Sequence, residues 1–196
     1  MTTVITVYDL PEGAEAPPVL ADGHTLHRAV GRPASFAWID LGESPSPESA
    51  ARLVAEAQGR PGALTGAYDA FHVNDRPAEP FGSGGDESVI FVNCLRFAPD
   101  QHDAAFAAWE RVNRYMVRKP GYRRHRLHRR VDAGAPFGLV NVVEWESPAA
   151  WQAAHDDGFR ALTGGDLPFI AQPTLCRAVE RRSTLAGETT DTEVAR

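Results

Sequence analysis

Residues 89–95 read VIFVNCL and echo VITVYDL at residues 4–10, and this pair of apolar, strand-like runs decides the fold. Three further matches follow in the same order along the chain: LHRAV (26–30) with LHRRV (127–131), FAWIDLGES (36–44) with LVNVVEWES (139–147), and SPESAARLVAEAQG (46–59) with SPAAWQAAHDDGF (147–159). Four matches in one order indicate a tandem duplication, and an internal repeat of this kind sets the architecture of the whole chain.

The duplication also predicts the domain organisation. A first repeat covers residues 1–73, and a second repeat covers residues 89–180. Between them, residues 74–88 have the glycine, proline, serine and acidic content of a linker. Residues 181–196 are polar, and we expect them to form a disordered tail.

Hydrophobic periodicity predicts the secondary structure of the second repeat. One face of an amphipathic helix is expected from the spacing of apolar residues in 99–119, and the Pro-Gly pair at 120–121 ends that helix. The complete prediction is the order β-α-β-β-α-β, with strands at 89–97, 122–131, 139–146 and 173–180 and helices at 99–119 and 148–162. This order is typical of a ferredoxin-like fold, in which both helices cover one face of a four-stranded antiparallel sheet.

The first repeat departs from this pattern at its first helix. Residues 11–23 read PEGAEAPPVLADG, and their three prolines and two glycines disfavour a helix. A sheet covered by helices on one face leaves its other face apolar, and that face must pack against a second sheet. We therefore expect an α+β fold in which two tandem ferredoxin-like repeats pack their antiparallel sheets into one α+β barrel within a single chain, the first repeat lacking its first helix.

Charge argues against a nucleic-acid partner. The 196-residue chain has 20 Lys and Arg against 26 Asp and Glu, a formal net charge of −6. The basic run YRRHRLHRR (122–130) is the exception. Strict strand alternation would place Tyr122, Arg124, Arg126, His128 and Arg130 on one side and the other four residues on the opposite side, so the charge is divided between two faces.

Cysteine content and the N-terminal sequence predict the compartment. Cys94 and Cys176 lie in apolar strand-like runs, where a free cysteine behaves as a small apolar residue. The first ten residues lack the basic and apolar regions of a signal peptide, and no run approaches membrane-spanning length. We expect a cytoplasmic protein with no membrane partner.

The second repeat, from Ser88 to Val179, resembles the antibiotic biosynthesis monooxygenase family in its KPGY, its VEWES and its alanine-rich last helix. Within that family, NVVEW is similar to the cofactor-independent oxygenases that convert polyketide anthrones to anthraquinones. The resemblance implies a catalytic role for Asn141, Trp145 and His128, and implies that Tyr115, Trp151 and Arg160 bind the substrate. It implies a polycyclic aromatic polyketide as substrate, dioxygen as co-substrate and a quinone as product, in antibiotic or pigment biosynthesis.

The residue types fit that chemistry. Asn141 and Trp145 are four apart on a predicted strand and so share a face, and a buried amide or indole N–H needs a polar partner that a flat phenol can supply. Such donors can stabilise a substrate carbanion that reduces dioxygen directly. No GxGxxG, P-loop, HxH, HxxxH or CxxC motif is present, and we expect no metal and no cofactor.

Other residues are expected in the same pocket or as its base. Asn93 shares a face with Phe91 on the first strand of the second repeat, so both are predicted to bind substrate. His128 and His155 are candidate bases because an unperturbed histidine titrates near neutrality, and His155 is also expected to bind the substrate. His27 matches His128 in the first repeat, which favours a structural role at that position.

Three functions remain open from the sequence. The first is the cofactor-independent oxygenase, and the second is an aromatic polyketide cyclase of the same architecture, which needs an acid and a base but no dioxygen. The third is a ligand-binding or heme-binding relative without enzyme activity. The sequence also leaves open whether the fused chain forms a homodimer. Trp38 and Gly42 hold the positions of Asn141 and Trp145 in the first repeat, so one working pocket is expected, in the second.

Overall fold

The computed structural model describes residues 2–11, 13–74, 81, 85 and 87–181. Within these residues the chain forms eight strands, four α-helices and one 3-10 helix, with the following bounds: β1 (Thr2–Tyr8), β2 (Thr25–Ala34), β3 (Trp38–Ser44), α1 (Pro47–Gln58), β4 (Ala63–Asn74), β5 (Val89–Arg96), η1 (Pro99–Gln101), α2 (His102–Met116), β6 (Tyr122–Arg130), β7 (Leu139–Trp145), α3 (Pro148–Ala154), α4 (Asp157–Thr163) and β8 (Ile170–Arg181). The predicted linker 74–88 and tail 181–196 fall largely outside the described residues.

The eight strands close a barrel in the order β1-β3-β2-β8-β5-β7-β6-β4, and every neighbouring pair is antiparallel. Each repeat contributes four adjacent strands in the ferredoxin-like order 2-3-1-4. Two equivalent seams join the repeats, because the second strand of each repeat pairs with the fourth strand of the other: β2 with β8, and β6 with β4. The predicted α+β barrel of two tandem repeats is confirmed.

Strand register relates the two repeats residue by residue. Tyr8 lies opposite Trp38 in the first repeat, as Asn93 lies opposite Asn141 in the second. Four residues further along the same strand, Gly42 of the first repeat takes the position that Trp145 has in the second. The sequence alignment of the first and third strands therefore matches their pairing in the structure.

The repeated Leu-His-Arg motif is in a shifted register. Trp38 pairs with Arg28, whereas its counterpart Asn141 pairs with Leu127, so the motif has moved by two residues along its strand. A shift of two preserves the face of every side chain. Accordingly, Nδ1 of His27 lies 3.3 Å from the Ile39 carbonyl oxygen, and Nδ1 of His128 lies 3.2 Å from that of Val140.

The barrel interior is an apolar core. Its buried side chains come from both repeats and include Ile5, Val7, Ile39, Ile90, Val92, Val140 and Val142. Cys94 and Cys176 are free thiols in this core, and burial raises the pKa of both thiols. They therefore pack as small neutral groups, as their apolar surroundings in the sequence predict.

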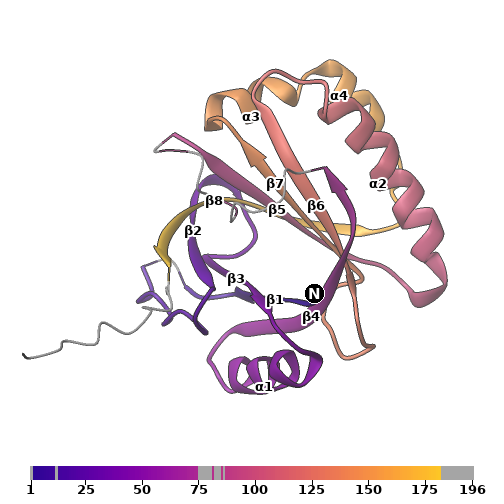
Figure 1. Ribbon diagram of the computed structural model, residues 1–196. Helices are drawn as coiled ribbons and strands as arrows, with labels where there is room; N and C mark the ends of the chain where they lie inside the picture. The colour runs from indigo at the N-terminus through magenta and orange to yellow at the C-terminus, as the bar shows by residue number, and fades with distance from the viewer. Residues whose placement is uncertain (1, 12, 75–80, 82–84, 86, 182–196) are drawn as a thin grey trace, which may run out of the picture.

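The helices cover the outside of the barrel and form two unequal layers (Figure 1). α1 packs alone on the first repeat, and its N-terminus is capped by Ser46, whose Oγ accepts from the Ser49 N–H at 3.2 Å. α2, α3 and α4 lie together over β5, β6 and β7 on the second repeat (Figure 1). The second repeat thus has a helical layer that the first repeat does not match.

The region between β1 and β2 explains this difference. Among its described residues, 9–11 and 13–24, the chain forms turns and no helix. His24 at the end of this region lies over Gly42, and its Nδ1 is 2.5 Å from Oδ1 of Asp40, whose Oδ2 accepts from the Leu20 N–H at 2.9 Å. His24, Asp40 and Leu20 are all buried. Side chains of the connecting segment therefore fill the space that the missing helix would cover.

Two local features differ from the expectation. The predicted helix 148–162 is two helices, because the chain breaks at His155 and Asp156 begins α4 as its N-cap. In β6 the register shifts between Tyr122 and Arg124, so Arg123 is an extra residue in a bulge. The predicted alternation across this strand is therefore wrong at its start: Tyr122 shares a face with His125, not with Arg124.

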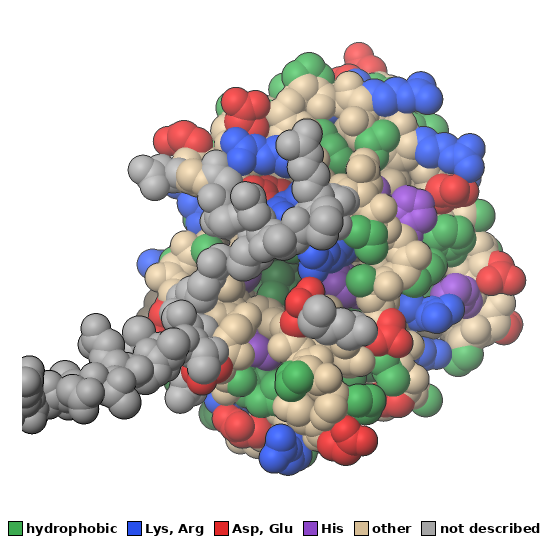
Figure 2. Space-filling view, viewed as in Figure 1, with side chains coloured by type: hydrophobic (Ala, Val, Ile, Leu, Met, Phe, Trp, Pro, Cys, Tyr) green, Lys and Arg blue, Asp and Glu red, His purple; other side chains and the backbone are tan. Residues whose placement is uncertain are grey.

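Ion pairs neutralise much of the basic strand. Nε of Arg124 donates to Oε2 of Glu144 at 2.7 Å, and both side chains are buried. Arg126 reaches the other repeat, where its Nη1 is 2.8 Å from Oε1 of Glu43. On the face shown in Figure 2, Lys and Arg side chains lie among Asp and Glu side chains and do not gather into one patch. Within the described part of the chain, none of the helices has the length and apolarity needed to cross a membrane.

We predict that Gly42→Ala destabilises the protein. A Cβ at this position would overlap the ring of the buried His24, and overpacking of this kind costs about 1–3 kcal/mol of unfolding free energy. Thermal unfolding should therefore occur several degrees lower than in the wild type. Gly165→Ala is the matched control, since a Cβ there has no atom within 4 Å. Equal unfolding temperatures for the two variants would contradict the conclusion that His24 fills the space over Gly42.

Candidate active site

A cavity of about 370 Å³ lies between the outer face of the second repeat's sheet and the helices α2, α3 and α4. Its floor is formed by β5, β6, β7 and the start of β8, and its roof by the three helices and the segment that follows them. The cavity is thus outside the barrel core and within one repeat. The three-helix layer is what creates it, because a helix stands off a sheet wherever the facing side chains do not fill the gap.

The floor places the main predicted residues together. Phe91 and Asn93 on β5 and Asn141 and Trp145 on β7 all line the cavity, since alternate residues of a strand share a face. Asn93 and Asn141 are direct cross-strand partners, so their two amides lie side by side. Two carboxamides and one indole therefore form a polar stripe on an otherwise apolar floor.

Polar atoms on these walls have no partner in the part of the chain that the structure describes. They are Oδ1 of Asn93, Oδ1 of Asn141, Nε1 of Trp145 and Nε1 of Trp151, all buried. Leaving a buried donor or acceptor unpaired costs about 1–3 kcal/mol for each group. Four such groups around one cavity indicate that a ligand with both donors and acceptors completes the site.

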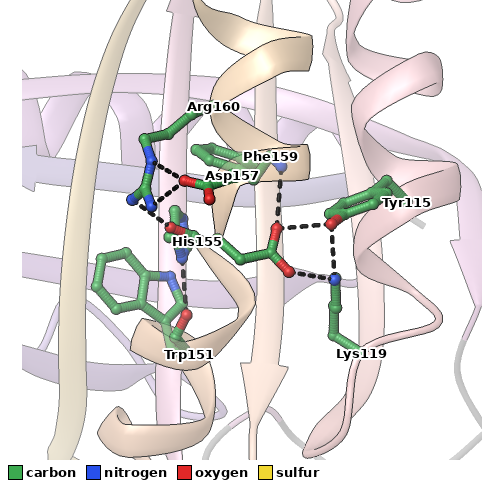
Figure 3. Close-up of polar contacts among 8 residues, drawn as sticks. Tyr115, Lys119, Trp151, His155, Asp157, Phe159 and Arg160 are labelled. Carbon is green, nitrogen blue, oxygen red and sulfur yellow. Dashed lines mark hydrogen bonds and ion pairs between the residues drawn. The ribbon is translucent and has the colours of Figure 1, made fainter.

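The roof is a run of aromatic side chains from α3 and α4. The His155 ring packs between Trp151 and Phe159, with centroids 4.1 Å and 4.3 Å away, and Trp151 also contacts Phe91 across the cavity at 5.7 Å. All four line the cavity. Figure 3 shows Trp151, His155 and Phe159 along the two short helices. This arrangement suits a flat aromatic ligand that stacks between roof and floor.

His155 is held as a neutral imidazole. Its Nδ1 lies 2.7 Å from the Trp151 carbonyl oxygen, so Nδ1 carries the hydrogen and donates it (Figure 3). Burial lowers the pKa of His155, which keeps the ring uncharged at neutral pH. The nitrogen Nε2 then has the available lone pair. His155 is therefore a cavity residue with an acceptor nitrogen.

Tyr115 does not line the cavity. Its hydroxyl donates to Oδ1 of Asp156 at 2.6 Å, and Nζ of Lys119 donates to that hydroxyl at 2.7 Å and to Oδ2 of Asp156 at 2.6 Å (Figure 3). The hydrogen bond from Lys119, followed by that from Tyr115, lowers the pKa of Asp156. Asp156 also accepts from the Phe159 N–H at 3.1 Å. Tyr115 thus ties the end of α2 to the break between α3 and α4, which fixes the roof.

Arg160 is also outside the cavity. Its guanidinium is exposed, pairs with Asp157 at 2.6 Å, and donates to the carbonyl oxygen of His155 at 3.0 Å (Figure 3). The carry-over of a substrate-binding arginine to this position therefore does not agree with the geometry. Arg160 is in the last turn of α4, and its exposed side chain is not among the residues that line the cavity.

His128 lies on the opposite face of the sheet from Asn141. After the β6 bulge, His125 and Leu127 pair with the cavity-lining residues Val143 and Asn141, whereas His128 pairs with Val140 of the barrel core. The structure therefore does not bring His128 to the cavity. Its contact with the Val140 carbonyl matches that of His27 with Ile39 in kind, which is the structural role that the repeat suggests.

Several cavity residues were not predicted from the sequence. Trp109, Val112, Asn113 and Met116 of α2 line the roof, although the periodicity of this helix predicts only a packed core face. Tyr122 lines the floor beside Trp145, with ring centroids 5.2 Å apart. Tyr122 directly follows the Pro-Gly pair and could have been noted in the sequence as a candidate aromatic. Which face of the sheet it lies on depends on the bulge at Arg123. Among the residues that the structure describes, no cluster of three His, Cys, Asp or Glu is placed to hold a metal ion.

Comparisons with known proteins found a family match and similar solved structures. Residues 88–158 match the family model Antibiotic biosynthesis monooxygenase. A monooxygenase-type protein from Shewanella loihica PV-4 is 30% identical over 48% of this chain and 96% of its own, with a TM-score of 0.44. The cofactor-independent oxygenase SnoaB from Streptomyces nogalater is 25% identical over 52% of this chain and 100% of its own, with a TM-score of 0.39.

Several solved structures match both repeats. An anthrone oxidase-like protein is 18% identical, with 91% of each chain covered and a TM-score of 0.65, which shows a shared fold. A comparison with curated protein sequences found no match. Through its second repeat, the chain belongs to the antibiotic biosynthesis monooxygenase family.

Proposed function

We propose that the second repeat is a cofactor-independent monooxygenase that oxidises an anthrone-like phenol of polyketide origin to a quinone. The observation that carries the proposal is the pairing of an aromatic-walled cavity with four unpaired polar atoms on its walls. Flat apolar rings match the walls, and phenolic and keto oxygens match the polar atoms. A purely aliphatic ligand would leave the polar atoms unpaired, and a highly charged one would lack a counter-ion there.

The size and shape of the cavity support a polycyclic ligand. Sites for small organic ligands are typically about 300–1,000 Å³, lined by apolar side chains with a few placed polar groups. Here Phe91, Trp109, Trp151 and Phe159 supply the apolar walls, and Asn93 and Asn141 sit side by side on the floor. We infer that the ring system lies between roof and floor with one oxygenated edge against the two amides.

The polar stripe can stabilise charge that develops on the substrate. Loss of a proton from the methylene of an anthrone places negative charge on the keto oxygen. The amide of Asn141 and the indole N–H of Trp145 are hydrogen-bond donors on one face of β7, and donors aimed at a developing oxyanion lower the barrier to its formation. Nε1 of Trp145 has no partner among the described residues and is available for this role, while the unpaired Oδ1 of Asn141 is an acceptor that fits a phenolic hydroxyl of the substrate.

The reaction then needs only dioxygen. The substrate carbanion gives one electron to dioxygen, and recombination of the two radicals forms a carbon–oxygen bond in a peroxide. The peroxide loses water, so one oxygen atom remains as the quinone carbonyl and the other leaves as water. Conversion of the methylene to a carbonyl supplies all four electrons that reduce dioxygen. An electron-rich substrate thus supplies the redox chemistry, while the protein orients it and excludes bulk water.

We predict that purified protein consumes oxygen with an anthrone-type substrate above the rate of autoxidation, and that Asn141→Ala lowers kcat on the order of 100-fold. Removal of one donor to an oxyanion has an effect of that size. Oxygen uptake by electrode and quinone absorbance give the two rates. Gln152→Ala is the matched control, because it deletes an exposed amide from α3.

Two results would contradict this proposal. Full activity of Asn141→Ala on the true substrate would mean that the polar stripe is not the site. Loss of water from a polyketide substrate without oxygen uptake would instead identify a cyclase, which can use the same cavity with a base and no dioxygen.

We also predict that Val112→Trp abolishes binding of the quinone product. Val112 lines the roof from α2, so an indole at this position would occupy space that the ring system needs. Isothermal titration calorimetry with an anthraquinone measures the affinity without turnover. Arg114→Trp places the same side chain on the exposed face of the same helix and should bind as the wild type does. Equal affinities for both variants would place the ligand elsewhere.

A further inference from the structure

Tyr122, His125 and His72 form a continuous chain of hydrogen-bonded groups that starts at the cavity floor and ends on the first repeat. We propose that this chain is a proton relay, which accepts the proton that the substrate loses and returns it to the peroxide. The proposal rests on the oxygenase function of the same cavity. It assigns the base to Tyr122 backed by two histidines, and it gives the first repeat a part in the reaction.

The first link exists because of the β6 bulge. In a regular strand, residues three apart point to opposite faces. The extra residue Arg123 reverses this, so Tyr122 and His125 lie on the same face. The Tyr122 hydroxyl is hydrogen-bonded to Nδ1 of His125, and Tyr122 lines the cavity. A bulge that re-aims one side chain next to a ligand cavity is a common device at functional sites.

The second link crosses the seam between the repeats. His72 is on β4 of the first repeat, and β4 has its own register shift between Ala70 and His72. Nδ1 of His72 lies 2.9 Å from Nε2 of His125, and the two rings are nearly parallel at 18° with centroids 5.1 Å apart. His125 therefore uses one ring nitrogen toward the cavity and the other toward His72. This is the geometry through which an imidazole passes a proton from one side to the other.

Two residues of α2 hold the relay in place. The Trp109 ring packs edge-on against both histidines, at 5.1 Å from His72 and 5.7 Å from His125. Nδ2 of Asn113 is 3.4 Å from Nε2 of His125, so it can donate to that nitrogen when the relay proton has moved on to His72. Trp109 and Asn113 both line the cavity. His125 is buried and His72 is half-buried, so the relay leads outward.

The proton path balances. The substrate C–H bond breaks, its electron pair stays on the substrate, and the proton goes to the Tyr122 oxygen. At the same time the Tyr122 proton passes to Nδ1 of His125, and the proton on Nε2 of His125 passes to Nδ1 of His72. After the substrate has reacted with dioxygen, the reverse movement protonates the peroxide anion, which then loses water. The reaction releases no net proton, so a store of one proton is sufficient.

The protonation state of the Tyr122 hydroxyl fits a group that passes a proton on, and not one that holds a negative charge as a permanent base. Burial raises the pKa of the Tyr122 hydroxyl, so this group stays protonated at neutral pH. A buried tyrosinate would be costly, whereas a hydroxyl that gains one proton as it gives up another never carries a full charge. In this path the transferred proton comes to rest on His72, and imidazole is the side chain best suited to take up and release a proton in a relay.

Kinetics of single and double variants test the relay. Tyr122→Phe should lower kcat on the order of 100-fold and His72→Gln at least about tenfold, with KM nearly unchanged in His72→Gln because this residue does not touch the substrate. Tyr122→Phe combined with His72→Gln should be no slower than Tyr122→Phe alone, since members of one proton path are not additive. His102→Gln is the control, a histidine at the start of α2 outside the relay. Unchanged kcat in His72→Gln, or multiplied effects in the double variant, would overturn the relay.

A spectroscopic readout separates the relay from the oxygenase proposal. In protein labelled with ¹⁵N-histidine, Tyr122→Phe should change the Nδ1 and Nε2 shifts of His125 and of His72, while His102 serves as an internal reference. Absence of oxygen uptake by the wild type would refute the oxygenase function but would leave this measurement intact. If the His72 shifts do not respond to Tyr122→Phe in a variant that unfolds at the wild-type temperature, the relay is refuted whatever the reaction.

Discussion

Strand edges are the constraint on which the structure depends. A four-stranded ferredoxin-like sheet has two edges whose backbone donors and acceptors must be paired or exposed to water. Here β2 pairs with β8 and β4 pairs with β6, so each repeat covers both edges of the other and the sheet closes on itself. Closure also buries the inner faces of both sheets in one core. Neither repeat is complete alone, although the cavity belongs to one of them.

Fusion of the two repeats allows them to differ. At equivalent positions the first repeat has Gly42 beneath a buried His24, and the second has Trp145 beneath a cavity. The first repeat fills its outer face with a short connecting segment and the single helix α1, while the second keeps three helices and the space below them. Two identical subunits would have to carry two equal sites. In a single chain, the first repeat can have a filled outer face while the second repeat has a cavity, and the first repeat then contributes to the barrel without carrying a site of its own.

The seam between β4 and β6 is where the first repeat approaches the site of the second. The pairing of β4 with β6 has a register shift between Ala70 and His72, and β6 has a second one in its pairing with β7. His72 and His125 are in contact across this seam, beside the cavity. A bulge interrupts the ladder of backbone hydrogen bonds and so weakens the local pairing. These irregularities nevertheless bring a side chain of the first repeat, His72, into contact with one of the second, His125. The filled repeat is thereby more than a support, because its last strand reaches the wall of the site.

The sequence by itself determined the duplication, the β-α-β-β-α-β order of the second repeat, and the shared face of Asn141 and Trp145, because alternation along a strand and helical periodicity are local properties of the chain. The same local rule failed at Tyr122, since one inserted residue reverses the face and a bulge forms only in the pairing of two strands. Tertiary structure alone decided that His128 faces the barrel core and that Arg160 faces solvent. It alone brought together residues 72 and 125, whose contact exists only once the barrel has closed.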